Sequence, residues 1–399
     1  MANPHESALH YPFGDALPAL GSTLEVAPGV RWVRMKLPFA LDHINLWLLR
    51  DCDEQGREGW TIVDCGIADD ATRAAWAQIF ANELQGLPVL RVIVTHMHPD
   101  HIGLAHWLCE RWSTAAGATT PNAAAGSPQG EARPHEEQGS GAVASVGVSA
   151  SVGVGAADCR LWISATDWTV ARLASQSSAG FGGADSATFF ARHGLVDPDS
   201  LAQMRQRTDY YRALVPQVPG RYRRLMDGMR IRIGAHDWTC IVGYGHAPEH
   251  IALYAPGLGL LISGDMVLPR ISTNVMVVDI EPEADPLPLY LASIAGLRSL
   301  PAATLVLPSH GKPFHGLHAR IEQLTTHHDE RYAEVLAACA ESPKSAADLL
   351  PVLFKRPLDL HQTTFAMGES IAHLHALQSA GRLRVAPETD GVQRFSSVV

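Results

Sequence analysis

Residues 95–103, which have the sequence THMHPDHIG, concentrate side chains that can bind a metal ion. His96, His98, Asp100 and His101 fall within six positions. Imidazole and carboxylate ligands without a thiolate suit a borderline divalent ion such as zinc, and also iron, manganese or cobalt. A packed histidine or a helix-capping aspartate would explain these residues one at a time, but not all four together. The segment therefore predicts a metal site.

This motif is expected to lie on a turn between a strand and a helix. The apolar run over residues 89–94 is typical of a buried strand, and apolar residues with helical spacing follow over 102–108. Side chains alternate along an extended chain, so His96, His98 and Asp100 can point to one side. The motif therefore follows the end of the strand, and His101 at the start of the helix is expected to point toward the other three side chains.

Three later segments each place a metal-capable side chain directly after an apolar strand. His246 occurs in GYGHAPEHIALY, Asp265 in LGLLISGDMV and His310 in TLVLPSHGKP. His250, which closely follows His246, is expected to support a ligand rather than to bind metal itself. Asp64 ends the apolar strand in GWTIVDCG, where it either caps a turn or orients a metal-bound histidine, and the sequence leaves both roles open.

The remaining ordered segments supply further strands and helices. VRWVRMKLPF, HINLWLLRD, CRLWI, MRIRIG and HDWTCIVG are expected strands, because β-branched and aromatic residues dominate them. Residues 69–86 are an expected helix. Ser164 and Asp167 have the spacing of a capping box and predict another helix start.

Two insertions differ in composition from these elements. Residues 113–157 are rich in Ala, Gly, Ser, Pro and Thr and are expected to form a flexible surface insertion. Residues 165–226 are expected to be mostly helical. They form either a solvated helical layer or a pocket wall, in which Tyr210 would contact a polar or anionic substrate group.

The overall composition is that of a globular chain. Of 399 residues, 46% are hydrophobic and 18% charged, with a formal net charge of −10. This acidic balance disfavours general attraction to nucleic acid or to an anionic membrane, although a local basic groove could still exist. The six cysteines form no CxxC pair, which indicates reduced thiols. Because there is no basic and apolar leader and no apolar run of spanning length, a cytoplasmic protein is expected.

The ordered series T-H-M-H-P-D-H, G-H-A-P-E-H, S-G-D and S-H-G resembles the metallo-β-lactamase superfamily of hydrolases, which includes the glyoxalase II type thioesterases. The resemblance covers residues 30–320 apart from the low-complexity insertion. It implies an α/β (α+β) fold, a four-layer αβ/βα sandwich in which two mixed sheets pack face to face with helices outside. In the turn that usually reads Asp-Thr-Gly, Cys65 replaces the Thr, which puts only a minor hydrogen bond in doubt.

The resemblance also implies a complete dinuclear metal site. It assigns one metal to His96, His98 and His246, the second to Asp100, His101 and His310, and the bridging position to Asp265. Two divalent ions about 3.5 to 4 Å apart would lower the pKa of a bridging water towards about 7. Zinc is the expected metal, with iron and manganese left open.

Four residues are candidates for catalysis or substrate binding beside this site. Asp100 is the expected catalytic residue, since it could orient the hydroxide and shuttle a proton to the leaving group. Arg270, Ser272 and Asn274 follow Asp265 and could contact a carboxylate or amide of the substrate. A structural turn is an equal alternative for these three.

The sequence pattern changes again in the C-terminal segment, which predicts a second domain. We expect a metallo-β-lactamase domain over residues 1–325 and a small helical domain over 326–399, which looks like the winged-helix appendage of a β-lactamase-like subgroup. From Ser342 to the end, six Lys or Arg stand against five Asp or Glu. This near-neutral balance favours packing, dimerisation or pocket closure over RNA binding.

The expected function is hydrolysis of a small-molecule ester, thioester or lactone. The alternatives are a single-strand endoribonuclease, supported only by the tail, and an iron-dependent redox enzyme of the same fold. The expected partner is a small-molecule substrate, without nucleic acid or membrane, and a homodimer stays open. The metal ligands specify that water is activated, but the sequence does not identify the bond that it attacks.

Overall fold

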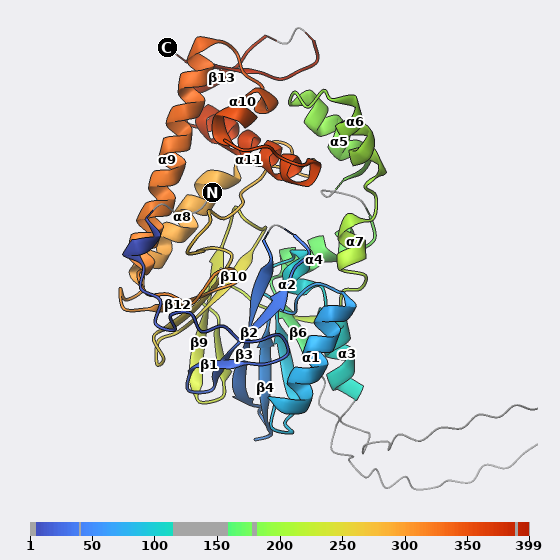
Figure 1. The fold of residues 1–399 in the computed structure, drawn as a ribbon, viewed down its shortest axis with the longest axis vertical. Helices are drawn as coiled ribbons and strands as arrows, with labels where there is room; N and C mark the ends of the chain where they lie inside the picture. The colour runs from blue at the N-terminus through green and yellow to red at the C-terminus, as the bar shows by residue number, and fades with distance from the viewer. Residues whose placement is uncertain (1–4, 40, 115–158, 178–181, 388–389, 399) are drawn as a thin grey trace, which may run out of the picture.

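The computed structural model describes residues 5–39, 41–114, 159–177, 182–387 and 390–398 (Figure 1). Its first sheet has seven strands in the order of the chain. They are β1 (Leu24–Ala27), β2 (Val30–Lys36), β3 (His43–Cys52), β4 (Glu58–Val63), β5 (Val89–Ile93), β6 (Arg160–Ile163) and β7 (Tyr222–Arg224). Strands β1 to β4 pair antiparallel, whereas β4 to β7 pair parallel. The parallel strands therefore end at one edge, where the THMHPDHIG motif begins.

The second sheet has five strands, in the order β12-β11-β10-β9-β8. They are β8 (Arg230–Ile233), β9 (His236–Gly243), β10 (His250–Ala255), β11 (Leu260–Gly264) and β12 (Leu305–Pro308). The antiparallel pairs β9–β10 and β10–β11 and the parallel pair β11–β12 give β9, β11 and β12 the same direction. The carboxyl ends of these three strands consequently lie at a common edge.

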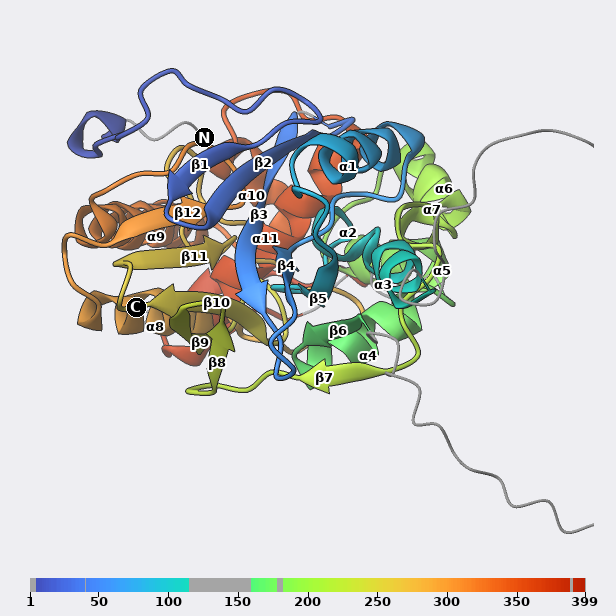
Figure 2. The same ribbon diagram turned by 90° about the horizontal axis from the view of Figure 1, so that it is seen from below.

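Three clusters of buried side chains define a four-layer sandwich. Successive side chains of β3 point to opposite faces of the first sheet. Leu46 and Leu48 therefore pack under the outer helices, whereas Trp47 and Leu49 pack between the two sheets. Helices α1 (Asp70–Asn82), α3 (Ala105–Thr114) and α4 (Ala165–Ala174) cover the outer face of the first sheet, and α8 (Pro286–Gly296) and α9 (Leu317–Glu341) that of the second (Figure 2). The sandwich expected from the sequence is confirmed.

Helix α1 illustrates how local sequence sets the element bounds. The Asp69 side chain caps its N-terminus by accepting a hydrogen bond from the Thr72 N–H, and the buried Ala75, Trp76 and Ile79 follow with helical spacing. The helix ends at Asn82, earlier than the predicted residue 86, and Gln85 and Gly86 then adopt positive φ angles of 57° and 72°. A left-handed turn therefore leads into β5.

Most of residues 165–226 are helical, as the sequence predicts. After α4 come α5 (Gly183–Arg192), α6 (Pro198–Gln206) and α7 (Tyr210–Leu214). The exception is β7, because its three residues pair parallel with β6 and extend the first sheet. Ser164 caps α4 by accepting from the Asp167 N–H, but the Asp167 carboxylate also points toward Met97 and Glu249.

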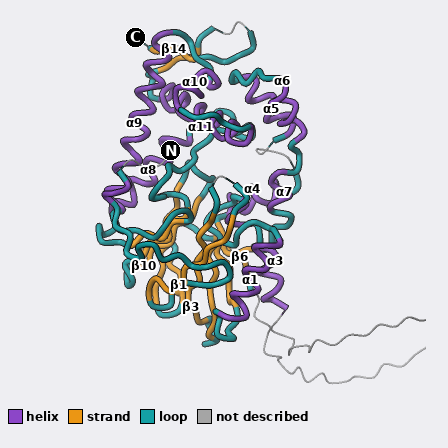
Figure 3. Tube along the Cα trace, viewed as in Figure 1, coloured by secondary structure: helices purple, strands orange, loops and turns teal. Residues whose placement is uncertain are grey.

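The C-terminal region contains α10 (Ala346–Leu353), α11 (Leu360–Ser379), β13 (Leu383–Val385) and β14 (Phe395–Ser397). A capping box between Ser345 and Asp348 starts α10, and β13 and β14 pair antiparallel beside these helices. Helix α9 runs unbroken across residue 325, so the boundary between two domains stays a prediction. Figure 3 shows the strands of the two large sheets at one end of the molecule, and α5, α6, α10 and α11 with the strand β14 at the other.

Short elements complete the description. One-turn 3-10 helices span Glu6–Ala8 and Leu297–Ser299, and the short helix α2 (Pro99–Ile102) carries part of the motif. The predicted insertion over residues 113–157 falls outside the described residues, except that Ser113 and Thr114 belong to α3. Of the described helices, none is both long and apolar enough to cross a membrane.

Candidate metal centre

The seven predicted metal ligands follow the ends of strands from both sheets. His96 comes after β5, and His246, Asp265 and His310 come after β9, β11 and β12. His101 lies on α2, whose first position is a proline suited to a helix start. The sandwich thus brings segments distant in sequence to one edge.

Three imidazoles form the first group. His96 Nε2 lies 2.9 Å from His98 Nδ1 and 3.2 Å from His246 Nε2. The candidate ligand atoms of all three residues lie within 4.8 Å of one another. The structure therefore brings together the three residues that the family resemblance assigned to one metal.

A second group combines one carboxylate with two imidazoles. Asp100 Oδ2 lies 3.4 Å from His310 Nε2 and 3.7 Å from His101 Nε2. These three residues again place their candidate ligand atoms within 4.8 Å. They are the residues that the sequence assigned to the second metal.

Asp265 lies between the two groups and faces each with a different oxygen. Its Oδ2 is 3.4 Å from His246 Nε2. Its Oδ1 is 3.7 Å from His101 Nε2 and 3.5 Å from His310 Nε2. One carboxylate can therefore contact ions in both groups, which is the geometry of a bridging ligand.

The spacing and the partners of these atoms fit divalent ions. Nitrogen ligands about 2.0–2.1 Å from a tetrahedral ion lie roughly 3.3–3.4 Å apart, close to the separation of His96 and His246. His101 Nε2 and Asp265 Oδ1 are buried without a hydrogen-bond partner among the described residues. Buried polar atoms are normally paired, so these two atoms point to ligands that would satisfy them.

The electrostatics differ between the two groups. Burial, with the neighbouring imidazoles, lowers the pKa of His96 well below its usual value, and burial lowers that of His98 to about 3. Burial also opposes protonation of His310, but the Asp265 and Asp100 carboxylates outweigh it and raise the pKa to about 10. The first group thus offers neutral imidazoles, whereas the second is a carboxylate-rich environment that favours a cation.

Hydrogen bonds to the far side of each ring orient these ligands. His246 Nδ1 lies 2.7 Å from the Asn274 carbonyl, and His310 Nδ1 lies 2.7 Å from the His43 carbonyl. Each Nδ1 therefore donates, so that Nε2 is left to face the cluster.

The two predicted supporting residues both lie against the cluster. Asp64 Oδ2 is 2.8 Å from His101 Nδ1, which is the orienting alternative of its two predicted roles. His250 Nε2 accepts a hydrogen bond of 3.1 Å from the Asp265 N–H. Each of these residues therefore forms a hydrogen bond to a candidate ligand, Asp64 to His101 and His250 to Asp265.

The predicted substrate residues are placed less uniformly. Arg270 is exposed and pairs with Glu6 at 3.2 Å, so no described contact brings it to the cluster. The Asn274 backbone carbonyl binds His246, and Ser272 is half-buried in the same loop, so the substrate contacts of their side chains stay predictions. Tyr210 begins α7, which contacts the motif helix α2 that carries Asp100. Burial and the Asp100 carboxylate raise the pKa of Tyr210 to about 12 against the opposing charge of Arg207.

An aromatic group that the sequence did not predict adjoins Tyr210. The His361 ring on α11 lies 5.6 Å from the Tyr210 ring, 5.7 Å from Phe39 and 4.8 Å from Phe365, measured between centroids. We call Phe39, Tyr210, His361 and Phe365 the aromatic wall. Its members come from three distant segments, so no local sequence signal could have identified it.

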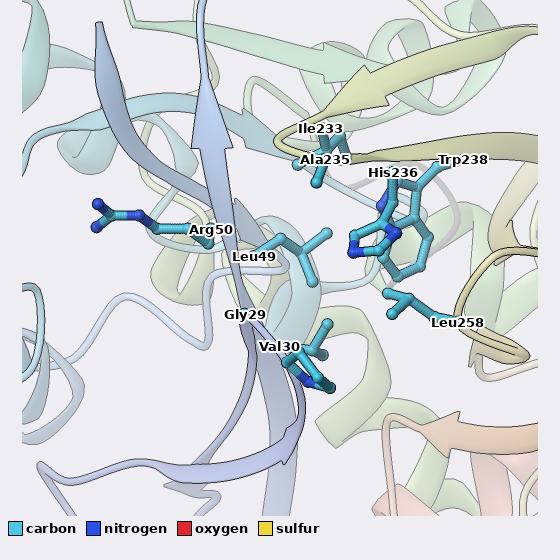
Figure 4. A pocket seen from close by; sticks show the side chains of 10 residues that line it. Gly29, Val30, Leu49, Arg50, Ile233, Ala235, His236, Trp238 and Leu258 are labelled. Carbon is cyan, nitrogen blue, oxygen red and sulfur yellow. The ribbon is translucent and has the colours of Figure 1, made fainter.

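An apolar cavity of about 220 Å³ lies elsewhere, between the two sheets. Figure 4 shows its lining, which includes Val30, Leu49 and Trp238. These residues lie near the start of β2, the end of β3 and the β8–β9 turn, at the end of the sandwich opposite the metal ligands. The cavity therefore has no part in the candidate site.

Comparisons with known proteins agree with this architecture. A family profile described as Metallo-beta-lactamase superfamily matches residues 41–310, and one described as Metallo-beta-lactamase-like, C-terminal domain, matches residues 332–398. The crystal structure of a beta-lactamase domain protein from Burkholderia ambifaria is 50% identical, with a TM-score of 0.83, and the match covers 98% of this chain and 99% of that one.

Two further relatives are more distant. A metallo-beta-lactamase family protein from Thermus thermophilus is 23% identical with a TM-score of 0.65, and the match covers 94% of this chain and 100% of that one. A probable metallo-hydrolase from Bacillus subtilis is 29% identical over 164 aligned residues, and the match covers 39% of this chain. That match spans 49% of the relative, or about half its length.

Proposed function

We propose, from the premise that this chain belongs to the metallo-β-lactamase superfamily, that it is a dinuclear metal-dependent hydrolase of a small-molecule ester, thioester or lactone. The observation that carries the proposal is the position of Asp265, whose two oxygens face two different groups of ligands. A mononuclear site would leave the second group, with its own carboxylate and two imidazoles, without a role.

The chain would hold its ions with the residues that lie together at the strand ends. His96, His98 and His246 would hold one, Asp100, His101 and His310 the other, and Asp265 would contact both. Zinc suits these donors, and iron and manganese are compatible with them. Two such ions supply Lewis acidity and water activation at neutral pH.

Proton transfer is assigned to Asp100. Its side chain is 19% exposed whereas that of Asp265 is 11% exposed, so Asp100 is the more accessible of the two carboxylates. It is therefore placed to take a proton from the attacking water and to return it to the leaving group. Tyr210, whose pKa is about 12, keeps its hydroxyl proton at neutral pH and can donate to a polar substrate atom.

The aromatic wall supports a substrate with an apolar acyl or aryl part. Its Tyr210 lies on α7, which contacts the motif helix α2, and its Phe365 is 36% exposed. Aromatic surface of this kind favours burial of apolar groups. The net charge of −10 opposes a polyanionic substrate such as RNA.

A metal assay paired with a substrate panel tests the proposal. We expect two equivalents of divalent metal per chain and hydrolysis within a panel of acyl thioesters, aryl esters and lactones, with β-lactams and phosphodiesters as comparison arms. Asp265→Asn should lower the metal content, whereas Asp279→Asn, outside the cluster, should not. Cleavage of phosphodiesters alone, or one equivalent of iron with redox activity, would overturn it.

A further inference from the structure

A buried carboxylate outside the metal ligands contacts both segments that carry the three-imidazole group. Asp167 lies in the first turn of α4 and is fully buried. Its Oδ1 accepts a hydrogen bond of 2.9 Å from the Met97 N–H, and its Oδ2 accepts one of 2.7 Å from the Glu249 N–H. We propose that Asp167 is a positioning residue that sets the geometry of the three imidazoles. The inference rests on the proposed function in one respect, that these imidazoles hold an ion.

The Met97 peptide is the first point of control. His96 and His98 flank Met97, so the orientation of that residue determines where both rings point. Asp167 holds its N–H, and the Tyr211 hydroxyl donates to its carbonyl from α7. With both sides of the residue fixed, His96 Nε2 and His98 Nδ1 stay 2.9 Å apart, close enough to face one ion.

Glu249 is the second point of control. It lies between His246 and His250, and its N–H is bound by Asp167. Its carboxylate accepts from the Thr166 hydroxyl at 2.8 Å, so the first turn of α4 holds this segment twice. Any displacement of the turn would move His246 relative to His96.

The two segments belong to different sheets. The motif follows β5 of the seven-stranded sheet, whereas residues 246–249 connect β9 and β10 of the five-stranded sheet. A backbone hydrogen bond from the Ile251 N–H to the Thr95 carbonyl, 2.8 Å long, joins the same segments just outside the ligands. Asp167 extends this link to the residues that neighbour the imidazoles themselves.

The chemistry of the three partners requires a carboxylate. The Met97 and Glu249 N–H groups donate to Asp167, and so does the Ser164 hydroxyl at 3.0 Å. An asparagine of the same size offers one acceptor oxygen, and its amide N–H would face a donor. Asp167→Asn should therefore release one of the two segments while the packing stays unchanged.

Metal binding by full-length Asp167→Asn tests the proposal. We expect zinc affinity, measured by competition with a chromophoric chelator, to fall about 10- to 100-fold, the usual effect of removing a group that orients a ligand. The visible bands of the cobalt(II) form should also shift, because the arrangement of the imidazoles changes. Asp167→Asn that folds and keeps wild-type affinity and cobalt bands would overturn the inference.

A matched control separates positioning from stability. Asp51 is equally a buried carboxylate that links the two sheets, accepting from the Gly234 N–H at 2.9 Å and pairing with Arg91 at 2.8 Å, but it lies at the opposite end of the sandwich. Asp51→Asn should lower the unfolding temperature without changing zinc affinity or the cobalt bands. An equal loss of zinc affinity in both variants would show that Asp167 supports the fold in general and does not position the imidazoles.

A milder variant covers the case in which Asp167→Asn does not fold. Tyr211→Phe keeps the ring and removes the hydrogen bond to the Met97 carbonyl. It should weaken zinc binding in the same direction by a smaller factor, and unchanged affinity and cobalt bands would contradict the proposed control of Met97. A wild-type protein that binds no metal would overturn both the proposed function and this inference, whereas normal binding by the variants would overturn the inference alone.

Discussion

Asp64 determines which nitrogen of His101 faces the other candidate metal ligands. Its Oδ2 lies 2.8 Å from His101 Nδ1, so that nitrogen donates and Nε2 points toward Asp100 and Asp265. The same residue adopts a left-handed backbone with φ of 62°, a conformation that aspartate tolerates better than most side chains. Its carboxylate also accepts from the Thr95 N–H at 2.8 Å, which ties this turn to the start of the motif. The strained backbone of Asp64 thus accompanies its role in orienting the His101 ring.

Asp100→Ala tests the assignment of proton transfer at the level of one residue. The variant loses the more accessible carboxylate of the cluster, and we expect kcat to fall about 10²- to 10⁴-fold at saturating metal. Metal content measured on the same sample separates lost catalysis from a lost ligand. Full turnover with normal metal content would show that another group carries the proton.

Gly103 controls how closely α2 approaches the turn after β4. A Cβ atom at this position would lie 2.6 Å from the carbonyl oxygens of both Gly66 and Pro99 and 2.8 Å from Ile67 Cα. Backbone atoms cannot move away as a flexible side chain can, so Gly103→Ala should lower the free energy of unfolding by about 1–3 kcal/mol. It should also weaken metal binding, since the motif shifts with α2.

Denaturant unfolding of metal-free protein checks this expectation. Gly296→Ala is the matched control, because that glycine has helical backbone and its added Cβ meets no atom within 4 Å. The control should be neutral or slightly stabilising. Equal stability of the two variants would mean that α2 tolerates a wider separation from the turn.

Four imidazoles lie on or directly after helices beyond residue 182; three are buried and that of His327 is half-buried. They are His193 after α5, His327 and His328 on α9, and His373 on α11. Burial lowers the pKa of His193, His327 and His373 to about 4 and also lowers that of His328. Because each folded-state pKa lies below the unfolded value of about 6.5, the unfolded chain binds protons first as the pH falls. The contribution of these imidazoles to stability is therefore fully present above about pH 6.5 and is lost between pH 6.5 and 4.

His193→Phe should reduce this sensitivity to acid. The phenylalanine ring replaces a buried imidazole whose Nδ1 has no hydrogen-bond partner among the described residues, and it removes one titrating group. A shift from 6.5 to about 4 corresponds to at most about 3 kcal/mol, so the loss of stability between pH 7 and pH 4 should shrink by up to that amount. Chemical unfolding at both pH values, in metal-free protein, measures it. A loss as large as in the wild type would exclude His193 as a contributor.

At the scale of the whole molecule, the sequence identifies some site residues more readily than others. Residues that come directly after a strand are easier to predict than residues that contact each other only in the folded structure. His96, His246, Asp265 and His310 each come directly after an apolar strand, so local pattern was sufficient to select them. Asp167 looked like a helix cap, because its contacts with Met97 and Glu249 depend on how two sheets pack. The aromatic wall depends on tertiary structure even more, since Phe39, Tyr210 and Phe365 lie in three distant segments.

The C-terminal helices are part of the same packed molecule as the sandwich. One cluster of buried side chains joins Leu261 and Val306 of the second sheet with Leu349 of α10 and Ile371 of α11. Helix α11 thereby reaches the metal end of the sandwich, and the pair formed by His361 and Phe39 connects it to the segment between β2 and β3. His43, at the start of β3, in turn binds His310 through its carbonyl. These contacts place the far C-terminal region next to a segment that supports the candidate metal centre, whose proposed ligands all lie before residue 311.

Phe365→Ala tests whether α11 contributes to substrate selection. Loss of a large apolar surface worth about 1.5–3 kcal/mol should lower kcat/KM roughly 10- to 100-fold for long-chain acyl or aryl substrates, mainly through KM, and much less for acetyl substrates. Metal content should stay at the wild-type level because Phe365 contacts the His361 ring and no candidate ligand in the described contacts. Leu289→Ala, an exposed apolar residue on the outer helix α8, is the control and should leave the dependence on chain length unchanged. If the dependence on chain length is the same in all three proteins, selectivity resides in the sandwich, and α11 supports the fold alone.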